Sequence, residues 1–299
     1  MKLRQILAVA VYNFRQWRRN PRIVLCFCLA FILCFLLSDK AVRFSRTYGS
    51  IMQILEPFIW TFGDANSILL SSLLLILLFA DMPFISAGTP FLLLRIDRKT
   101  WVLGQALYIV AATTVYLLFV LLSTSFICQS RSFLGNQWSE TAAILGYSGA
   151  GQAVALPALV KTLELSLPYA CTAWIFALML LYTLLLVFLM LLCNLRFGQL
   201  GGVIGVLGFS LYGFLLNPKT IQTIFQIPDE WMYKANVAVG WLSPLNQATY
   251  HMHNFGYDLL PKLWQTVAIF LALIALLFFL SLHAVRRYNF SFIGTEGGT

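Results

Sequence analysis

The chain has 299 residues, of which 60% are hydrophobic and only 10% are charged, and its formal net charge is +9. A soluble domain carries roughly 25% charged residues because its surface must be solvated, so this composition excludes an ordinary soluble protein. The positive charges are concentrated in the loops on one side of the predicted spans, which is typical of a membrane protein. We therefore expect no nucleic-acid partner.

The first 20 residues predict an amphipathic helix that lies on the membrane surface. At helical spacing the apolar residues share one face, which comprises Leu3, Ile6, Leu7, Ala10, Phe14 and Trp17. Arginines and glutamines lie opposite, near the lipid headgroups. Two interpretations stay open: a membrane anchor alone, or an elbow that also contacts a cytoplasmic partner.

Six stretches are long and apolar enough to cross a bilayer, since about 20 apolar residues span its hydrocarbon core. They are continuously apolar rather than alternating, which favours helices over barrel strands. We place them at about 22–41, 66–84, 103–126, 168–193, 200–216 and 263–285. Pro57 and the stretch "GDANS" argue against one helix running from residue 51 to 84.

The sequence thus predicts an all-α polytopic membrane protein, with a single six-span domain over 21–290. We expect outer loops at about 127–167 and 217–262, the second folded into short helices, and a tail over 291–299. Six spans put both termini on one side, where twelve of the twenty Lys and Arg residues lie, against eight in the longer loops opposite. This bias predicts cytoplasmic termini. We expect the chain to be a multi-pass protein of the plasma membrane, that of a bacterium.

A search for catalytic and nucleotide-binding motifs is negative. The sequence has no GxxxxGK[ST], HExxH, GxSxG or CxxC pattern. His251 and His253 have no obvious third metal ligand, so we interpret them as ordinary loop residues. Glu56, Asp64 and Asp81 lie near span ends, where a carboxylate reaches water at low cost. No charge lies in the middle of a span, so no ion-coupling site is indicated.

The cysteines and glycines bear on packing. Cys128 and Cys171 are the pair placed to meet at the outer ends of their spans, but membrane cysteines usually act as small apolar residues. The fifth span is rich in glycine, which lets another helix approach closely. Its glycines are Gly198, Gly201, Gly202, Gly205 and Gly208. We favour packing within this chain, with a subunit interface as the alternative.

The charged stretch "GTPFLLLRIDRKTW" separates the second and third spans. Thr89 and Pro90 form a helix start, in which a hydroxyl cap precedes a proline at the first helical position. A short helix is therefore predicted to project on the terminal side and to end in the basic turn "RIDRK".

With this stretch, the sequences "YNFRQWRRNP" and "WLSPLNQATY" and the glycine-rich fifth span, the chain resembles the permease subunits of ATP-binding-cassette (ABC) type 2 transporters. The resemblance implies a coupling helix over about 88–100 that docks on a separate cytoplasmic ATPase. Its contact residues would be Thr89, Pro90, Phe91, Leu94, Arg95, Asp97, Arg98 and Lys99. The elbow helix would lie beside the same ATPase through Arg15, Trp17, Arg18 and Arg19. The chain departs from many relatives in having Gly88 and Thr89 where they carry an acidic residue.

The function implied by this resemblance is that of an exporter subunit rather than an enzyme. Two ATPase copies would bind ATP and Mg, and a second six-span permease, identical or related, would complete the pump. This chain itself is expected to bind no cofactor. The substrate would be amphipathic: a peptide, a drug or a lipid-like molecule, including an antimicrobial peptide in export or immunity. Two alternatives stay open, namely an ATP-independent membrane capture module and a polytopic lipid-modifying enzyme.

Overall fold

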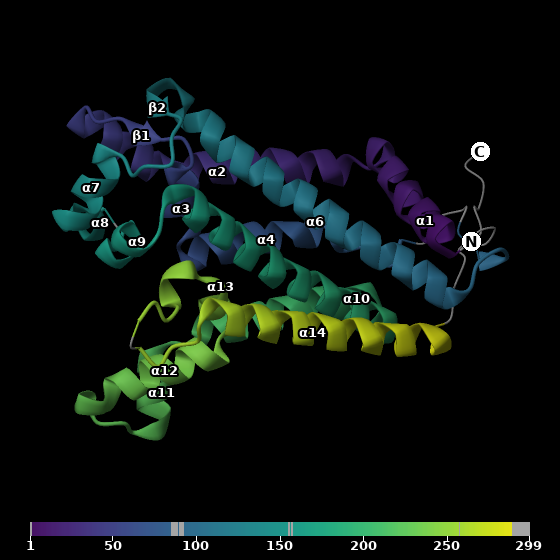
Figure 1. Cartoon of the computed structure of the whole chain (residues 1–299). Helices are drawn as coiled ribbons and strands as arrows, with labels where there is room; N and C mark the ends of the chain where they lie inside the picture. The colour runs from purple at the N-terminus through teal and green to yellow at the C-terminus, as the bar shows by residue number, and fades with distance from the viewer. Residues whose placement is uncertain are drawn as a thin grey trace.

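The computed structural model describes residues 2–84, 89, 93–154, 156, 158–256 and 258–288. Long helices dominate it and run roughly alongside one another (Figure 1). They are α1 (Lys2–Gln16), α2 (Pro21–Tyr48), α4 (Ala65–Phe79), α6 (Arg98–Cys128), α10 (Pro168–Leu215) and α14 (Leu263–Ala284). The all-α expectation is thus confirmed for the described residues, apart from one parallel pairing of two-residue strands, β1 (Met52–Gln53) and β2 (Ser132–Phe133).

Shorter elements gather at the two ends of the bundle. The end that holds α1 and the last described residues is called the terminal end, and the opposite end is called the loop end. The terminal end includes η1 (Trp17–Arg19) and η5 (Val285–Arg287). The loop end includes α3 (Glu56–Phe62), η2 (Gln129–Arg131), α7 (Glu140–Tyr147), α8 (Ala150–Ala153), α9 (Val160–Leu165), α11 (Pro218–Phe225), η3 (Asp229–Trp231), α12 (Met232–Leu242), α13 (Pro244–Ala248) and η4 (Tyr250–Met252).

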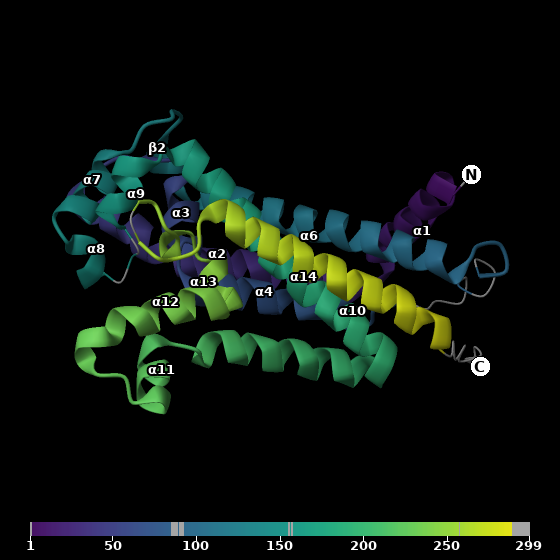
Figure 2. The ribbon, with the colours of Figure 1, turned by 60° about the horizontal axis from the view of Figure 1, so that its bottom comes forward.

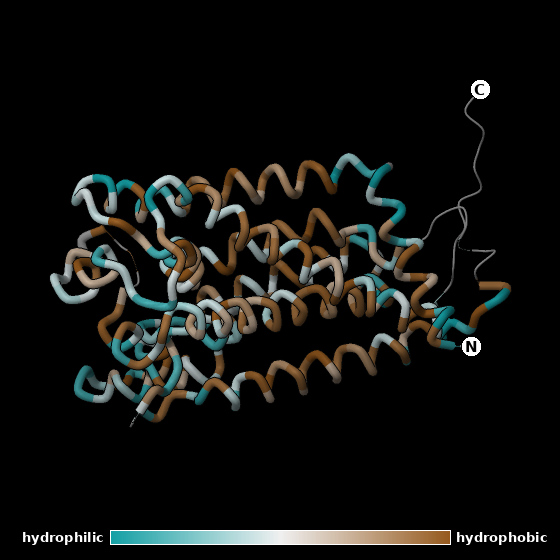
Figure 3. The backbone as a smooth tube through the Cα atoms, turned by 45° about the horizontal axis from the view of Figure 1, so that its top comes forward, coloured by the Kyte–Doolittle hydropathy of each residue, from teal (hydrophilic) through white to brown (hydrophobic). Residues whose placement is uncertain are grey.

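The hydropathy of the bundle is that of a membrane-spanning protein. The helices α2, α6, α10 and α14 are long and apolar enough to cross a bilayer, and the bent pair α3 and α4 would make a fifth span. Apolar residues fill the middle of the bundle and hydrophilic ones concentrate toward its ends (Figure 3). The short helices expected after residue 217 are present as α11, α12 and α13.

The stretch "GDANS" breaks the chain between α3 and α4 as the sequence predicts, with a bend of 89°. Asp64 caps α4, because its carboxylate accepts hydrogen bonds from the backbone N–H groups of Asn66 and Ser67 at 3.1 and 3.3 Å. All seven residues of α3 are buried, so this short helix is part of the protein interior at the loop end.

Helix α10 is a hairpin of two arms, 168–197 and 199–215, which meet at Gly198 with φ 79° and ψ 179°. Such a backbone conformation is open to glycine and strained for other residues. The side chains of Tyr182 and Ser210 lie together. In a straight helix residues 28 positions apart would be separated by roughly 42 Å, so the second arm must fold back along the first. Figure 2 shows this return.

Several predicted span boundaries need correction. α2 continues to Tyr48 rather than 41, because its polar continuation is amphipathic and contains an Asp39–Arg43 ion pair of 2.7 Å one turn apart. α6 begins at Arg98 rather than 103. α4 ends at Phe79 rather than 84, since the residue before Pro83 is disfavoured in a helix. Hydropathy marks where a helix is apolar, whereas these helices extend past that limit.

Candidate functional site

The elbow helix α1 is docked on the terminal half of α6. Gly104 allows the close approach: a Cβ added there would lie 2.5 Å from the Cβ of Val9. Next to this contact the Asn13 side-chain amide donates a buried hydrogen bond of 2.8 Å to Gln105. The buried pair is costly to separate because each amide would lose its partner in an apolar setting. Helix α1 is therefore fixed to α6 by packing and by a specific polar contact.

The faces of α1 differ from the prediction. Val9, Ala10 and Asn13 are buried, whereas Leu3 and Leu7, predicted on the same apolar face as Ala10, are exposed. The face of α1 that packs on α6 includes the polar Asn13, because the Asn13 side-chain amide has a hydrogen-bond partner on α6. Leu3 and Leu7 remain available to lipid. The interpretation of α1 as a membrane anchor is compatible with this exposed apolar side, but α1 is also an integral part of the bundle.

Trp17 follows α1 and extends the same contact. Its indole N–H donates a hydrogen bond of 2.7 Å to the Tyr108 hydroxyl on α6. Its ring lies 5.0 Å from that of Phe14 and 5.7 Å from that of Phe27. Of the predicted elbow contacts, Arg15 and Arg18 are exposed, and the Arg19 side chain lies outside the described residues. Trp17 is thus mainly internal, while Arg15 and Arg18 face outward.

The predicted coupling segment is only partly a helix of its own. Pro90 and Phe91 lie outside the described residues, and Thr89 is helical and buried. Residues 94–96 form a turn, and Arg98 and Lys99 belong to the first turn of α6. Leu94 is 84% exposed at this turn, next to the exposed Arg95. The segment therefore presents one apolar side chain among charged ones.

Arg98 has an internal role in addition to its place in the basic turn. Its guanidinium donates hydrogen bonds to the carbonyl oxygens of Arg286 at 3.0 Å and Tyr288 at 3.3 Å, where the chain leaves α14. A cation at carbonyls that end a helix is favourable because it offsets their partial negative charge. Arg98 therefore ties the start of α6 to the last described residues after α14.

The chain that follows α4 is held against the bundle by two polar contacts. Arg22, at the start of α2, pairs with Asp81 at 2.5 Å. The amide of Asn194, on the first arm of α10, donates to the Met82 carbonyl at 2.5 Å. These contacts fix residues 81 and 82 against two membrane-crossing helices.

The glycines of the fifth span have different surroundings. Gly202 lies against Asn194 and Gly205 against Cys193, both on the other arm of the hairpin, and Gly201 lies against Phe197. Gly198 forms the turn itself, whereas a side chain at Gly208 would meet open space. The tightest contacts between the two arms therefore involve Gly202 and Gly205.

The histidines at the loop end have separate structural partners. Nδ1 of His251 lies 3.0 Å from the Thr162 hydroxyl on α9, and Nε2 of His253 lies 3.0 Å from the Thr266 hydroxyl on α14. Burial lowers the pKa of His251 to about 4, and the neighbouring His253 adds to the effect. Within the described residues no group of three His, Cys, Asp or Glu side chains is arranged to hold a metal ion.

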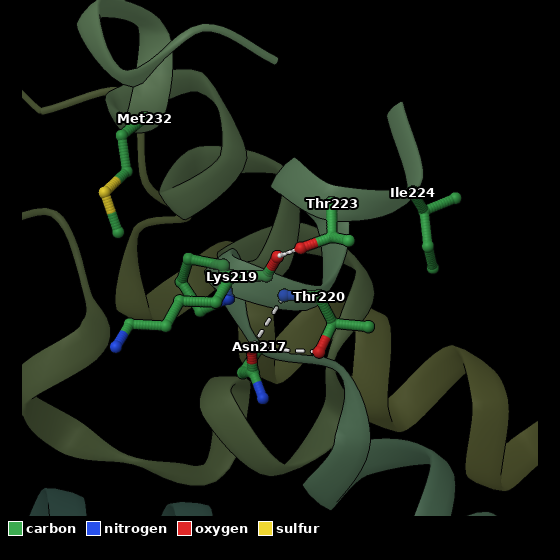
Figure 4. Close-up of a pocket in the computed structure, with 7 residues that line it drawn as sticks. Asn217, Lys219, Thr220, Thr223, Ile224 and Met232 are labelled. Carbon is green, nitrogen blue, oxygen red and sulfur yellow. Dashed lines mark hydrogen bonds between the residues drawn. The ribbon is translucent and has the colours of Figure 1, made fainter. Parts of the chain in front are cut away.

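A hollow of about 630 Å³ lies beside α11, with Met232 of α12 on its wall (Figure 4). Its polar groups already serve the helix: Asn217 accepts hydrogen bonds from the N–H and hydroxyl of Thr220, and the Thr223 hydroxyl donates to the Lys219 carbonyl. A site that selects a ligand needs polar groups aimed into it. This hollow is therefore a weaker candidate than the terminal end.

Sequence reasoning missed the buried polar partners. Glu56 was expected to reach water, but it is fully buried and accepts hydrogen bonds from the Ser139 backbone N–H at 2.8 Å and from its hydroxyl at 2.6 Å. All six cysteines are free thiols, Cys128 and Cys171 included.

Comparison with family models, with curated proteins and with solved structures finds no match to the chain.

Proposed function

We propose that this protein is the permease subunit of an ATP-driven exporter, as its resemblance to ABC type 2 permeases implies. The observation that carries the proposal is Leu94, an apolar side chain 84% exposed at the tip of a charged turn at the terminal end. An apolar side chain surrounded by charged ones is a common anchor at protein interfaces, which supports a docking role for this turn.

The proposed role of this turn is to receive force from a cytoplasmic ATPase. Leu94 and Arg95 would contact the partner, and the adjoining α6 would move with them because Arg98 and Lys99 are already in its first turn. In this proposal α4 and the two arms of α10 each cross the membrane, which with α2, α6 and α14 gives six spans and cytoplasmic termini. Two copies of the chain, or one with a relative, would enclose the path of an amphipathic substrate.

The experiment is purification of the tagged chain from its native membranes in mild detergent, followed by photolabelling with azido-ATP and measurement of ATP hydrolysis. Leu94→Asp should lower both the labelled partner and the hydrolysis, since loss of an interface anchor costs about 2 kcal/mol, a factor of roughly 30 in affinity. Leu134→Asp is the matched control, because Leu134 is 81% exposed at the loop end.

Two results would contradict the proposal. One is a wild-type preparation that contains no nucleotide-labelled partner, which would favour the ATP-independent capture module. The other is equal ATP hydrolysis in the Leu94→Asp and Leu134→Asp preparations, which would make Leu94 irrelevant to docking.

A further inference from the structure

The first three turns of α2 form one wall of an apolar groove with a volume of about 770 Å³. Its lining is apolar except at one end, where Arg18 is the charged residue. The groove is lined by Trp17, Arg18, Ile23, Val24, Phe27, Cys28, Phe31, Ile32 and Phe119. It lies on a helix apolar enough to cross the membrane, so hydrocarbon rather than water would meet its walls.

The floor of the groove is built from aromatic rings that hold one another. The ring of Phe27 lies 5.0 Å from that of Phe119, nearly perpendicular to it, and 5.7 Å from that of Trp17. Trp17 is itself held by its hydrogen bond to Tyr108. Edge-to-face contacts of this kind fix ring orientation. The groove is therefore a formed feature of the surface, and its occupant would lose little affinity to reorganisation of the protein.

The length of the groove matches one leaflet. Ile23 and Ile32 are nine residues apart on α2, which corresponds to about 14 Å along the helix axis. Half of the hydrocarbon core is about 15 Å. Arg18 precedes α2 and is exposed at the terminal end of the groove. Among the described residues no ion pair engages Arg18, in contrast to Arg22, which pairs with Asp81.

We infer that this groove binds an anionic phospholipid of the leaflet on the terminal side, with one acyl chain along α2 and the phosphate at Arg18. A guanidinium recognises phosphate through paired, charge-assisted hydrogen bonds. A second copy of the chain on the same face would bring another basic terminal end toward this one, so charge favours the lipid. The inference does not depend on the proposed ATPase partner.

The test is native mass spectrometry of the purified full-length chain, titrated separately with phosphatidylglycerol and phosphatidylcholine. We expect tighter binding of phosphatidylglycerol, roughly tenfold weaker binding in Arg18→Gln, and loss of binding in Val24→Trp, where the indole fills the groove. The matched controls are Arg15→Gln, an exposed arginine outside the groove lining, and Val115→Trp, an exposed valine elsewhere on the membrane face. Both controls should bind like wild type.

Three outcomes would overturn the inference. Equal binding of the two lipids by the wild type would show that the lipid charge is not recognised. Equal losses of phosphatidylglycerol binding in Arg15→Gln and Arg18→Gln would show a general effect of surface charge rather than a site at Arg18. A lipid-free dimer that Val24→Trp splits into monomers, visible directly in the measured mass, would assign the groove to a second copy. Arg18 and Val24 are both exposed, so neither substitution disturbs the core.

Discussion

The side chain of Asn194 lies directly against Gly202, on the facing arm of the α10 hairpin. A Cβ added to Gly202 would be 1.8 Å from Oδ1 of Asn194, while the amide nitrogen of Asn194 donates to the Met82 carbonyl. One glycine thus makes room for the side chain that joins α10 to the end of α4.

Gly202→Ala should destabilise the hairpin, because Asn194 can move only by giving up its bond to Met82. Overpacking of this kind costs about 1–3 kcal/mol. Gly208→Ala, which meets open space in the same arm, should be neutral or slightly stabilising. Thermal unfolding in detergent compares the two variants, and equal midpoints would show that the arms are not packed in this way.

The buried pair of Glu56 and Ser139 should hold the loop end together. Glu56→Ala and Ser139→Ala should each accelerate amide hydrogen exchange in α7, since each leaves a buried polar group unpaired at a cost of about 1–3 kcal/mol. The double variant should cost less than the sum of the two, because both remove the same contact. Glu140→Ala, an exposed carboxylate in the next position, is the control. Strict additivity would contradict the pairing.

Arg98→Ala should loosen the terminal end, since its guanidinium bonds carbonyl groups that follow α14. The contact is exposed, so we expect a loss of about 1 kcal/mol or less in stability. Faster exchange at residues 285–288 in Arg98→Ala, and not in Lys99→Ala, would establish the tie. No difference between these two neighbouring cations would mean that Arg98 acts only as a surface charge.

The pH dependence of stability should reveal His251. Its folded-state pKa is about 4 and its ordinary value is 6.5, so the unfolded chain binds the proton more readily. The stability due to neutral His251 is complete above pH 6.5 and falls as the pH drops toward 4. Between pH 7 and pH 5 this loss is about 2 kcal/mol.

The measurement is denaturant unfolding at pH 7 and pH 5 for the wild type, His251→Gln and His283→Gln. His251→Gln should show a smaller loss on acidification, whereas His283→Gln, which changes an exposed histidine, should follow the wild type. A wild-type loss that persists unchanged in His251→Gln would exclude this histidine as its source.

Membrane orientation is tested by single cysteines introduced at exposed positions of the two ends. Asn236→Cys, on α12 at the loop end, should react with an impermeant maleimide added outside intact cells, and Lys99→Cys should react only after the membrane is opened. Labelling of Lys99→Cys from outside would invert the topology.

The long apolar helices, the break at "GDANS" and the short helices after residue 217 could be predicted from the sequence. Each depends on local composition: a run of apolar residues, an N-capping aspartate, or prolines that interrupt a helix. The C-terminal end of α2 and the N-terminal end of α6 could not be predicted from the sequence. Charged turns beyond an apolar run are helical only where they pack against other helices or form an ion pair.

The polar contacts could not be predicted for a different reason. Asn13 and Gln105 are 92 positions apart, and Glu56 and Ser139 are 83 positions apart. Periodicity shows which face of a helix is apolar but not which distant helix it meets. The partner of Asn13 therefore could not be inferred from its place in α1, and Glu56 was expected to lie near water.

The docking of α1 on α6 sets a problem of timing during synthesis. Asn13 emerges from the ribosome 92 residues before its partner Gln105, a delay of roughly 5–20 s at ordinary elongation rates. During that interval α1 has no protein surface to bind. Its amphipathic sequence gives it a temporary place on the membrane, and the side with Leu3 and Leu7 is the part that stays exposed after docking. The membrane surface thus binds α1 until α6 has been synthesised and inserted.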